Sequence, residues 1–79
     1  MATIKKQIRR HVATVLGIEF EDVPEEINLI EIGLHSLALL RLIEPLSKLA
    51  GARIDYADLA RRPTVRDWDV LVAGRSKTV

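Results

Sequence analysis

Residues 29–40 carry most of the information in this chain, and they run Leu29-Ile30-Glu31-Ile32-Gly33-Leu34-His35-Ser36-Leu37-Ala38-Leu39-Leu40. An apolar segment with one glycine leads to Ser36, and the spacing of the following leucines predicts a helix that starts at this serine. A serine at a helix start is commonly an N-cap. The same position also suits a phosphate ester, because free backbone N–H groups and the positive helix end favour anions.

Hydrophobic periodicity predicts an all-α fold, a four-helix bundle of three main helices and a short third one. The predicted stop and start residues are Thr3, Gly17, Gly51, Asp55 and Thr64, and Asp67 three residues after Thr64 imitates a capping box. Gly74 is expected to end the last helix. The predicted helices cover residues 4–16, 36–50, 56–61 and 65–73, and Trp68 is expected in the core.

A long connection joins the first two helices over residues 17–35. Such length in a compact domain indicates a functional or internally packed loop. Its apolar residues are expected to attach it to the helices, and they are Ile18, Phe20, Val23, Ile27, Leu29, Ile30, Ile32 and Leu34. In the helix that follows, Leu37 and Leu40 fall outside the apolar stripe, and Pro45 must remove one backbone hydrogen bond.

Length and composition indicate one domain over residues 1–79, with residues 75–79 as a flexible tail. The chain has no cysteine and two histidines, so no metal site is expected. The net charge of +1 gives no reason to expect a polyanionic partner. No secretory signal and no membrane-spanning run is visible, and a monomeric cytoplasmic protein is expected.

The motif around Ser36 resembles the phosphopantetheine attachment site of acyl and peptidyl carrier proteins. The resemblance extends along the chain through Leu16-Gly17, Val23-Pro24, residues 28–37 and Pro63-Thr64. Residues 54–64 together with Trp68 are most similar to aryl carrier domains of nonribosomal peptide synthetases. His35 departs from that pattern, because aryl carriers usually have Asp there, whereas peptidyl carriers often have His.

The resemblance implies a non-catalytic carrier with 4′-phosphopantetheine attached to Ser36 by a phosphopantetheinyl transferase. An adenylating enzyme would load an acyl, aryl or aminoacyl group as a thioester, and a condensation or tailoring enzyme would receive it. Neither nucleic acid nor a membrane is an expected partner. The residues that the resemblance assigns to the partner-facing surface, or that lie beside the serine, are His35, Leu37, Leu40, Arg41, Tyr56 and Ala60.

Three other functions were weighed against the carrier. A hydrolase would pair His35 with Ser36, but neighbouring residues at a helix start rarely point at each other and no orienting acid is evident. A small nucleic-acid binder would use the basic residues of the first helix, Lys5, Lys6, Arg9 and Arg10, although six acidic residues in the loop oppose this. A helical protein-interaction module without a prosthetic group is the third alternative.

Overall fold

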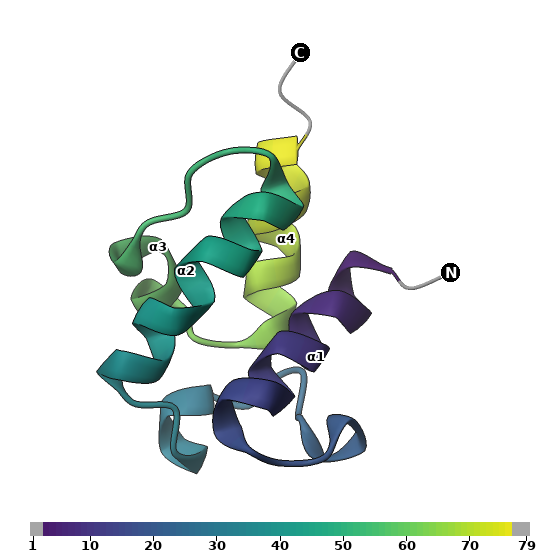
Figure 1. Ribbon diagram of the computed structural model, residues 1–79, viewed down its shortest axis with the longest axis vertical. Helices are drawn as coiled ribbons and strands as arrows, with labels where there is room; N and C mark the ends of the chain where they lie inside the picture. The colour runs from purple at the N-terminus through teal and green to yellow at the C-terminus, as the bar shows by residue number, and fades with distance from the viewer. Residues whose placement is uncertain (1–2, 77–79) are drawn as a thin grey trace.

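The computed structural model describes residues 3–76, and these residues form helices joined by loops, with no strand (Figure 1). The elements follow one another as α1 (Ile4–Leu16), η1 (Phe20–Asp22), η2 (Leu29–Ile32), α2 (Ser36–Ala50), α3 (Tyr56–Arg61) and α4 (Val65–Ser76), where η1 and η2 are short 3-10 turns. The predicted all-α fold is confirmed, and so are the bounds of α1, α2 and α3.

The core lies where α1, α2 and α4 contact one another, while α3 packs on α2 (Figure 1). Trp68 is buried, as predicted, and its indole Nε1–H donates a hydrogen bond of 3.1 Å to the carbonyl of Leu59. This bond ties α4 to α3 through the centre of the domain. Aliphatic side chains make up the rest of the core, chiefly Ile8, Val12, Leu29, Leu34, Leu39, Leu42, Leu46, Ile54, Leu59, Val65 and Val72.

Local capping explains why the helices begin and end where the sequence predicts. Thr3 accepts a hydrogen bond from the Lys6 N–H, and Gly17 and Gly51 take the left-handed conformation after α1 and α2. At the start of α4, the Thr64 hydroxyl accepts from the Asp67 N–H and donates to the Asp67 carboxylate. This is the predicted interaction of Thr64 with Asp67, in a variant of the capping box.

The end of α4 differs from the prediction. The helix continues through Gly74 to Ser76, so Gly74 does not end it and the flexible tail does not begin at Arg75. The guanidinium of Arg75 donates to the Arg53 carbonyl at 2.7 Å and lies 3.3 Å from Asp58 Oδ2, which anchors this last turn to the segment around α3. The remainder of the predicted tail, residues 77–79, lies outside the described residues.

Helix α2 continues without a break through Pro45. The proline is half-buried and lines a hollow of about 290 Å³ together with His11, Glu44, Lys48 and Leu49. It therefore faces the surface groove between α1 and α2.

The long loop is packed less completely than predicted. Val23, Leu29 and Leu34 are buried, but the side chains of Ile18, Ile27, Ile30 and Ile32 are exposed. Backbone hydrogen bonds to the start of α4 hold the loop where its side chains do not. The Leu29 N–H donates to the Pro63 carbonyl, and the Arg66 N–H donates to the Glu25 carbonyl. The second half of the loop is thereby fixed to residues 63–66, which are far from it in sequence.

Arg9 fixes the first half of the loop. Its Nη2 donates to the carbonyl oxygens of Phe20 and Val23 at 3.2 and 3.1 Å, and its guanidinium lies 4.5 Å from the centre of the Phe20 ring. Glu25 completes the arrangement with ion pairs to Lys5 and Arg9. Lys5 and Arg9, two of the basic residues that the nucleic-acid alternative would use, therefore hold the loop.

Candidate functional site

Ser36 is the first residue of α2, and its side chain is exposed. The N-cap position belongs to His35, whose side chain makes no capping hydrogen bond. The common alternative for this serine, an N-cap role, is thus not what the structure shows. The hydroxyl of Ser36 is not used by its own helix and faces the surface.

The first turn of α2 leaves backbone donors available around that hydroxyl. The first backbone bond of this helix runs from the Leu39 N–H to the His35 carbonyl. Within residues 3–76, the N–H groups of Ser36, Leu37 and Ala38 have no hydrogen-bond acceptor. Free N–H groups at a helix start, together with the helix dipole, stabilise a negatively charged group.

The preceding loop delivers Ser36 in a defined position. Asn28 starts η2 by accepting a hydrogen bond of 2.8 Å from the Ile30 N–H, and the Leu34 N–H donates to the Leu29 carbonyl. Gly33 lies between these two interactions. Its φ of 113° is a conformation that residues with a Cβ rarely adopt. The buried side chain of Leu34 then fixes the chain two residues before the serine.

Helix α3 contributes one polar group to the site. The hydroxyl of Tyr56 donates a hydrogen bond to Ser36 Oγ at 3.2 Å, across twenty residues of sequence. The tyrosine is the first residue of α3 and is 38% exposed. This contact places the start of α3 beside the start of α2, and the hydrogen bond between the two hydroxyl groups was not predicted from the sequence.

Apolar side chains extend from the serine along the same part of the surface. Leu37 and Leu40 are 53% and 52% exposed, so the loop does not cover them. Ile30 and Ile32, in the turn before α2, are exposed as well, although the sequence analysis assigned them to packing. His35 and Arg41 are also exposed, whereas Ala60 is half-buried and packs against the core.

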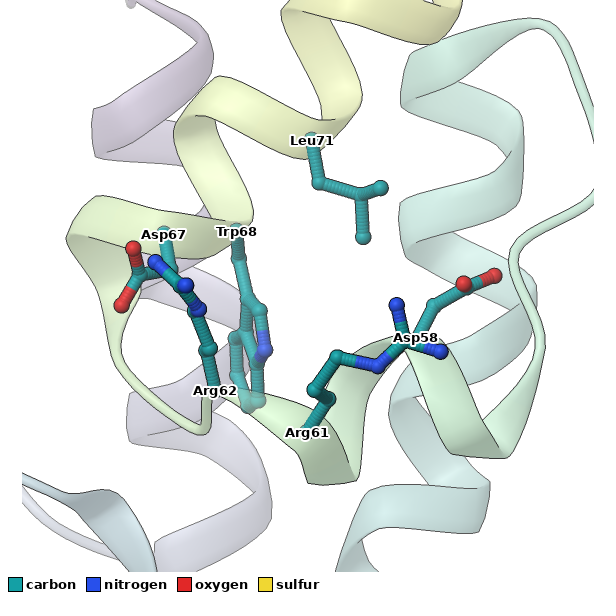
Figure 2. A pocket seen from close by; sticks show the side chains of 6 residues that line it. All are labelled: Asp58, Arg61, Arg62, Asp67, Trp68 and Leu71. Carbon is teal, nitrogen blue, oxygen red and sulfur yellow. The ribbon is translucent and has the colours of Figure 1, made fainter.

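A separate pocket of about 320 Å³ lies between α3 and α4, and Ser36 is not among the residues that line it (Figure 2). Asp58 and Arg61 approach it from α3, while Trp68 and Leu71 approach it from α4 (Figure 2). The hydrogen bond from the Asp55 N–H, helped by Arg75 and Arg61, holds the pKa of Asp58 below its usual value of 3.8. Asp58, at the edge of the pocket, is thus held by a structural ion pair with Arg75.

No group of three or more His, Cys, Asp and Glu side chains that could hold a metal ion occurs within residues 3–76. In the same part of the chain, none of the helices combines the length and the hydrophobicity needed to cross a bilayer.

Comparison with known proteins adds independent information. The family model for the phosphopantetheine attachment site matches residues 6–68. The chain is 32% identical over 74 residues to an isochorismatase of Bacillus subtilis, and 38% identical over 74 residues to the phenyloxazoline synthase MbtB of Mycolicibacterium paratuberculosis. These matches cover 94% and 92% of the chain. They cover only 23% and 6% of the two relatives, so the similarity concerns one segment of each larger protein.

Proposed function

Because this chain belongs to the phosphopantetheine attachment family, we propose that Ser36 is the residue that carries the arm. As a member of that family the chain is a carrier domain that holds 4′-phosphopantetheine covalently on a serine, and it is not itself a catalyst. The observation that supports Ser36 is its position, exposed at the first residue of α2 with unpaired backbone N–H groups around it.

The other serines fit this role less well. The chain has three, Ser36, Ser47 and Ser76. Ser47 lies in the last turns of α2, where its hydroxyl accepts a hydrogen bond of 2.9 Å from the Ile54 N–H. It therefore supports the connection to α3, and it lies at the end of the helix where an anion is disfavoured.

The groups around Ser36 suit a phosphodiester. Backbone N–H groups and the Tyr56 hydroxyl are hydrogen-bond donors, and the anionic oxygens of a phosphate are strong acceptors. When attached, the arm supplies the thiol that this cysteine-free chain lacks, and it holds the cargo as a thioester.

Attachment is a displacement at phosphorus. Ser36 Oγ forms a bond to the phosphorus next to pantetheine in coenzyme A, and the pyrophosphate P–O bond breaks. Adenosine 3′,5′-bisphosphate leaves with that electron pair, and the serine proton passes to a base of the transferase. Within this chain, His35 is the nearest titratable neighbour in sequence, and we assign it to contact with the transferase.

Carrier domains interact with transferases and synthetases in general. We propose more specific partners for this chain. The match to a phenyloxazoline synthase supports an aryl or aminoacyl cargo and a place in nonribosomal peptide synthesis or a related pathway. An adenylating enzyme would then load the arm, and a condensation or tailoring enzyme would receive the cargo. Adenylation consumes ATP and arm attachment consumes coenzyme A, so the proposal places the carrier in the cytoplasm.

The surface beside Ser36 is the proposed docking site for these enzymes. Leu37 and Leu40 supply exposed apolar area next to the attachment point, and Arg41 lies beside them on α2. Exposed apolar patches beside a functional group commonly mark interaction sites, and a few anchor residues can carry most of the binding energy. Ala60 and Tyr56 would border this surface from α3.

Incubation with a promiscuous phosphopantetheinyl transferase and coenzyme A, followed by intact-protein mass spectrometry, tests the assignment. The wild-type chain should gain one phosphopantetheine mass, and Ser36→Ala should keep its fold and gain none. Ser47→Ala is the matched control and should be modified like the wild type. Modification of Ser36→Ala, or peptide mapping of the arm to Ser47 or Ser76, would overturn the proposal.

A further inference from the structure

Tyr56 provides a hydrogen-bond donor next to the attachment point, and its role can be made more specific than suiting a phosphodiester in general. Its hydroxyl lies 3.2 Å from Ser36 Oγ, and both side chains are exposed. It is the only tyrosine in the chain. The bond connects the first residue of α3 to the first residue of α2, so it links two helices at the reacting atom itself.

Arm attachment changes the acceptor that this hydroxyl faces. Before attachment, Ser36 Oγ is a neutral hydroxyl oxygen that can accept a hydrogen bond. Afterwards the same atom is an ester oxygen, while anionic phosphate oxygens lie one bond beyond it. Hydrogen bonds to ionised acceptors are shorter and roughly twice as strong as those between neutral groups. A donor already within 3.2 Å of Oγ needs only a small movement to reach one of them.

We propose that Tyr56 is a positioning residue for the arm, because its hydroxyl exchanges the bond to Ser36 Oγ for a bond to a phosphate oxygen when the arm is attached. The tyrosine keeps its proton in both states, so only the acceptor changes. The inference rests on the proposed attachment at Ser36. It adds that α3 is connected to the root of the arm, and that this short helix therefore responds to the modification state of the carrier.

Helix α3 is short and has few contacts of its own that would resist such a response. The helix has six residues, and among them Leu59 is buried while Tyr56 and Arg61 are exposed. Its start is held by the Asp55 N–H, which donates to Asp58 Oδ2. Since α3 packs mainly on α2, a change in the bond between Tyr56 and the start of α2 acts on the interface that positions α3.

The single tyrosine permits a direct spectroscopic test. Tyrosine labelled with ¹³C at Cζ would give one ring signal, whose shift depends on the hydrogen bond made by the hydroxyl. Three states are compared: unmodified wild type, Ser36→Ala, which removes the acceptor, and wild type carrying the arm. We expect the Cζ shifts to fall in the order Ser36→Ala, unmodified wild type, modified wild type. The modified protein should lie farthest from Ser36→Ala because its hydrogen bond is the strongest. Coincidence of the modified protein with Ser36→Ala would show that the bond is lost, and would overturn the inference.

The ³¹P signal of the arm gives a second readout, which reports on the phosphate acceptor instead of the tyrosine donor. In Tyr56→Phe carrying the arm, the phosphodiester resonance should be displaced from its wild-type position. Val70→Ala, which alters an exposed apolar residue on α4, is the matched control and should leave the resonance in place. An identical ³¹P resonance in wild type and Tyr56→Phe would contradict the inference even if every protein is modified. Failure of wild type to gain the arm at Ser36 would instead reject the proposed function.

Discussion

At the residue scale, Arg9 fixes the first half of the loop between α1 and α2. It binds two loop carbonyls, stacks on Phe20 and pairs with Glu25, and its side chain is only 17% exposed. Lysine at this position would keep the charge, but a single ammonium group cannot reproduce the planar arrangement of donors. The contribution of Arg9 therefore depends on its shape as well as on its charge.

Arg9→Lys is expected to lower the free energy of unfolding by about 1–3 kcal/mol, since hydrogen bonds to charged groups are lost in a half-buried setting. Guanidinium denaturation followed by circular dichroism would measure the change. Arg10→Lys, on the exposed side of α1, is the matched control and should stay within about 0.5 kcal/mol of wild type. Equal stability of the two variants would show that the loop does not depend on the guanidinium.

Contacts between single residues explain most of what the sequence analysis missed. The sequence placed Arg9 only among the basic residues of the first helix, because the carbonyls that it binds lie eleven and fourteen residues away. The contact of Tyr56 with Ser36 spans twenty residues and joins two exposed polar groups, which no hydrophobic pattern reveals. The position of Ser36 itself was predictable, because a local motif and a helix start coincide there.

Element bounds were predictable where local capping sets them. Thr3, Gly17, Gly51 and Asp55 flank the helices as expected, since each acts through backbone geometry within a few residues. The predicted end of α4 was wrong because Arg75 is anchored to Arg53 and Asp58, which are far away in sequence. The predicted packing of the loop was wrong in part, because an irregular backbone has no periodicity that would separate buried from exposed isoleucines.

Pro45 is a test of element-scale energetics. The residue lacks the N–H that would donate to the Arg41 carbonyl in a regular helix, yet α2 continues through it. Pro45→Ala restores the donor and should raise the free energy of unfolding by about 1–2 kcal/mol, less than the full penalty of a helix-interior proline because some packing against the α1–α2 groove is lost. Thermal and chemical denaturation would both report the change.

Pro45→Gly separates the two contributions to that gain. It restores the same N–H group, but glycine is about 1 kcal/mol less favourable than alanine inside a helix. The glycine variant should therefore be less stable than the alanine variant by about this amount. An alanine variant less stable than wild type would mean that the proline ring contributes more through packing than it costs in hydrogen bonding.

The proposed docking surface belongs to the scale of the whole molecule, because residues of both α2 and α3 would contribute to it. Leu40→Asp should slow transfer of the cargo to the downstream enzyme roughly 10-fold, as expected when an anchor residue is lost. Stability should change by no more than about 0.5 kcal/mol, since Leu40 is 52% exposed, and arm attachment should proceed. Single-turnover transfer from the loaded carrier measures this rate.

Val70→Asp is the matched control for that experiment. Val70 is 67% exposed on α4 and carries the same kind of change from an apolar to an acidic side chain. Its transfer rate should equal that of wild type. Equal slowing by both variants would indicate a general effect of added negative charge, and unchanged transfer in Leu40→Asp would place the docking surface elsewhere on the domain.

The attachment of the loop to the turn at residues 63–66 has a consequence for biosynthesis of the chain. Ribosomes make proteins from the N-terminus, so the loop and Ser36 emerge well before Pro63 and Arg66, whose backbone groups bond to Leu29 and Glu25. A nascent chain that already displays the serine still lacks the partners that order the approach to it. Long-range pairing of this kind forms late in folding. We therefore expect arm attachment to follow completion of the domain, so that unfinished chains stay unmodified.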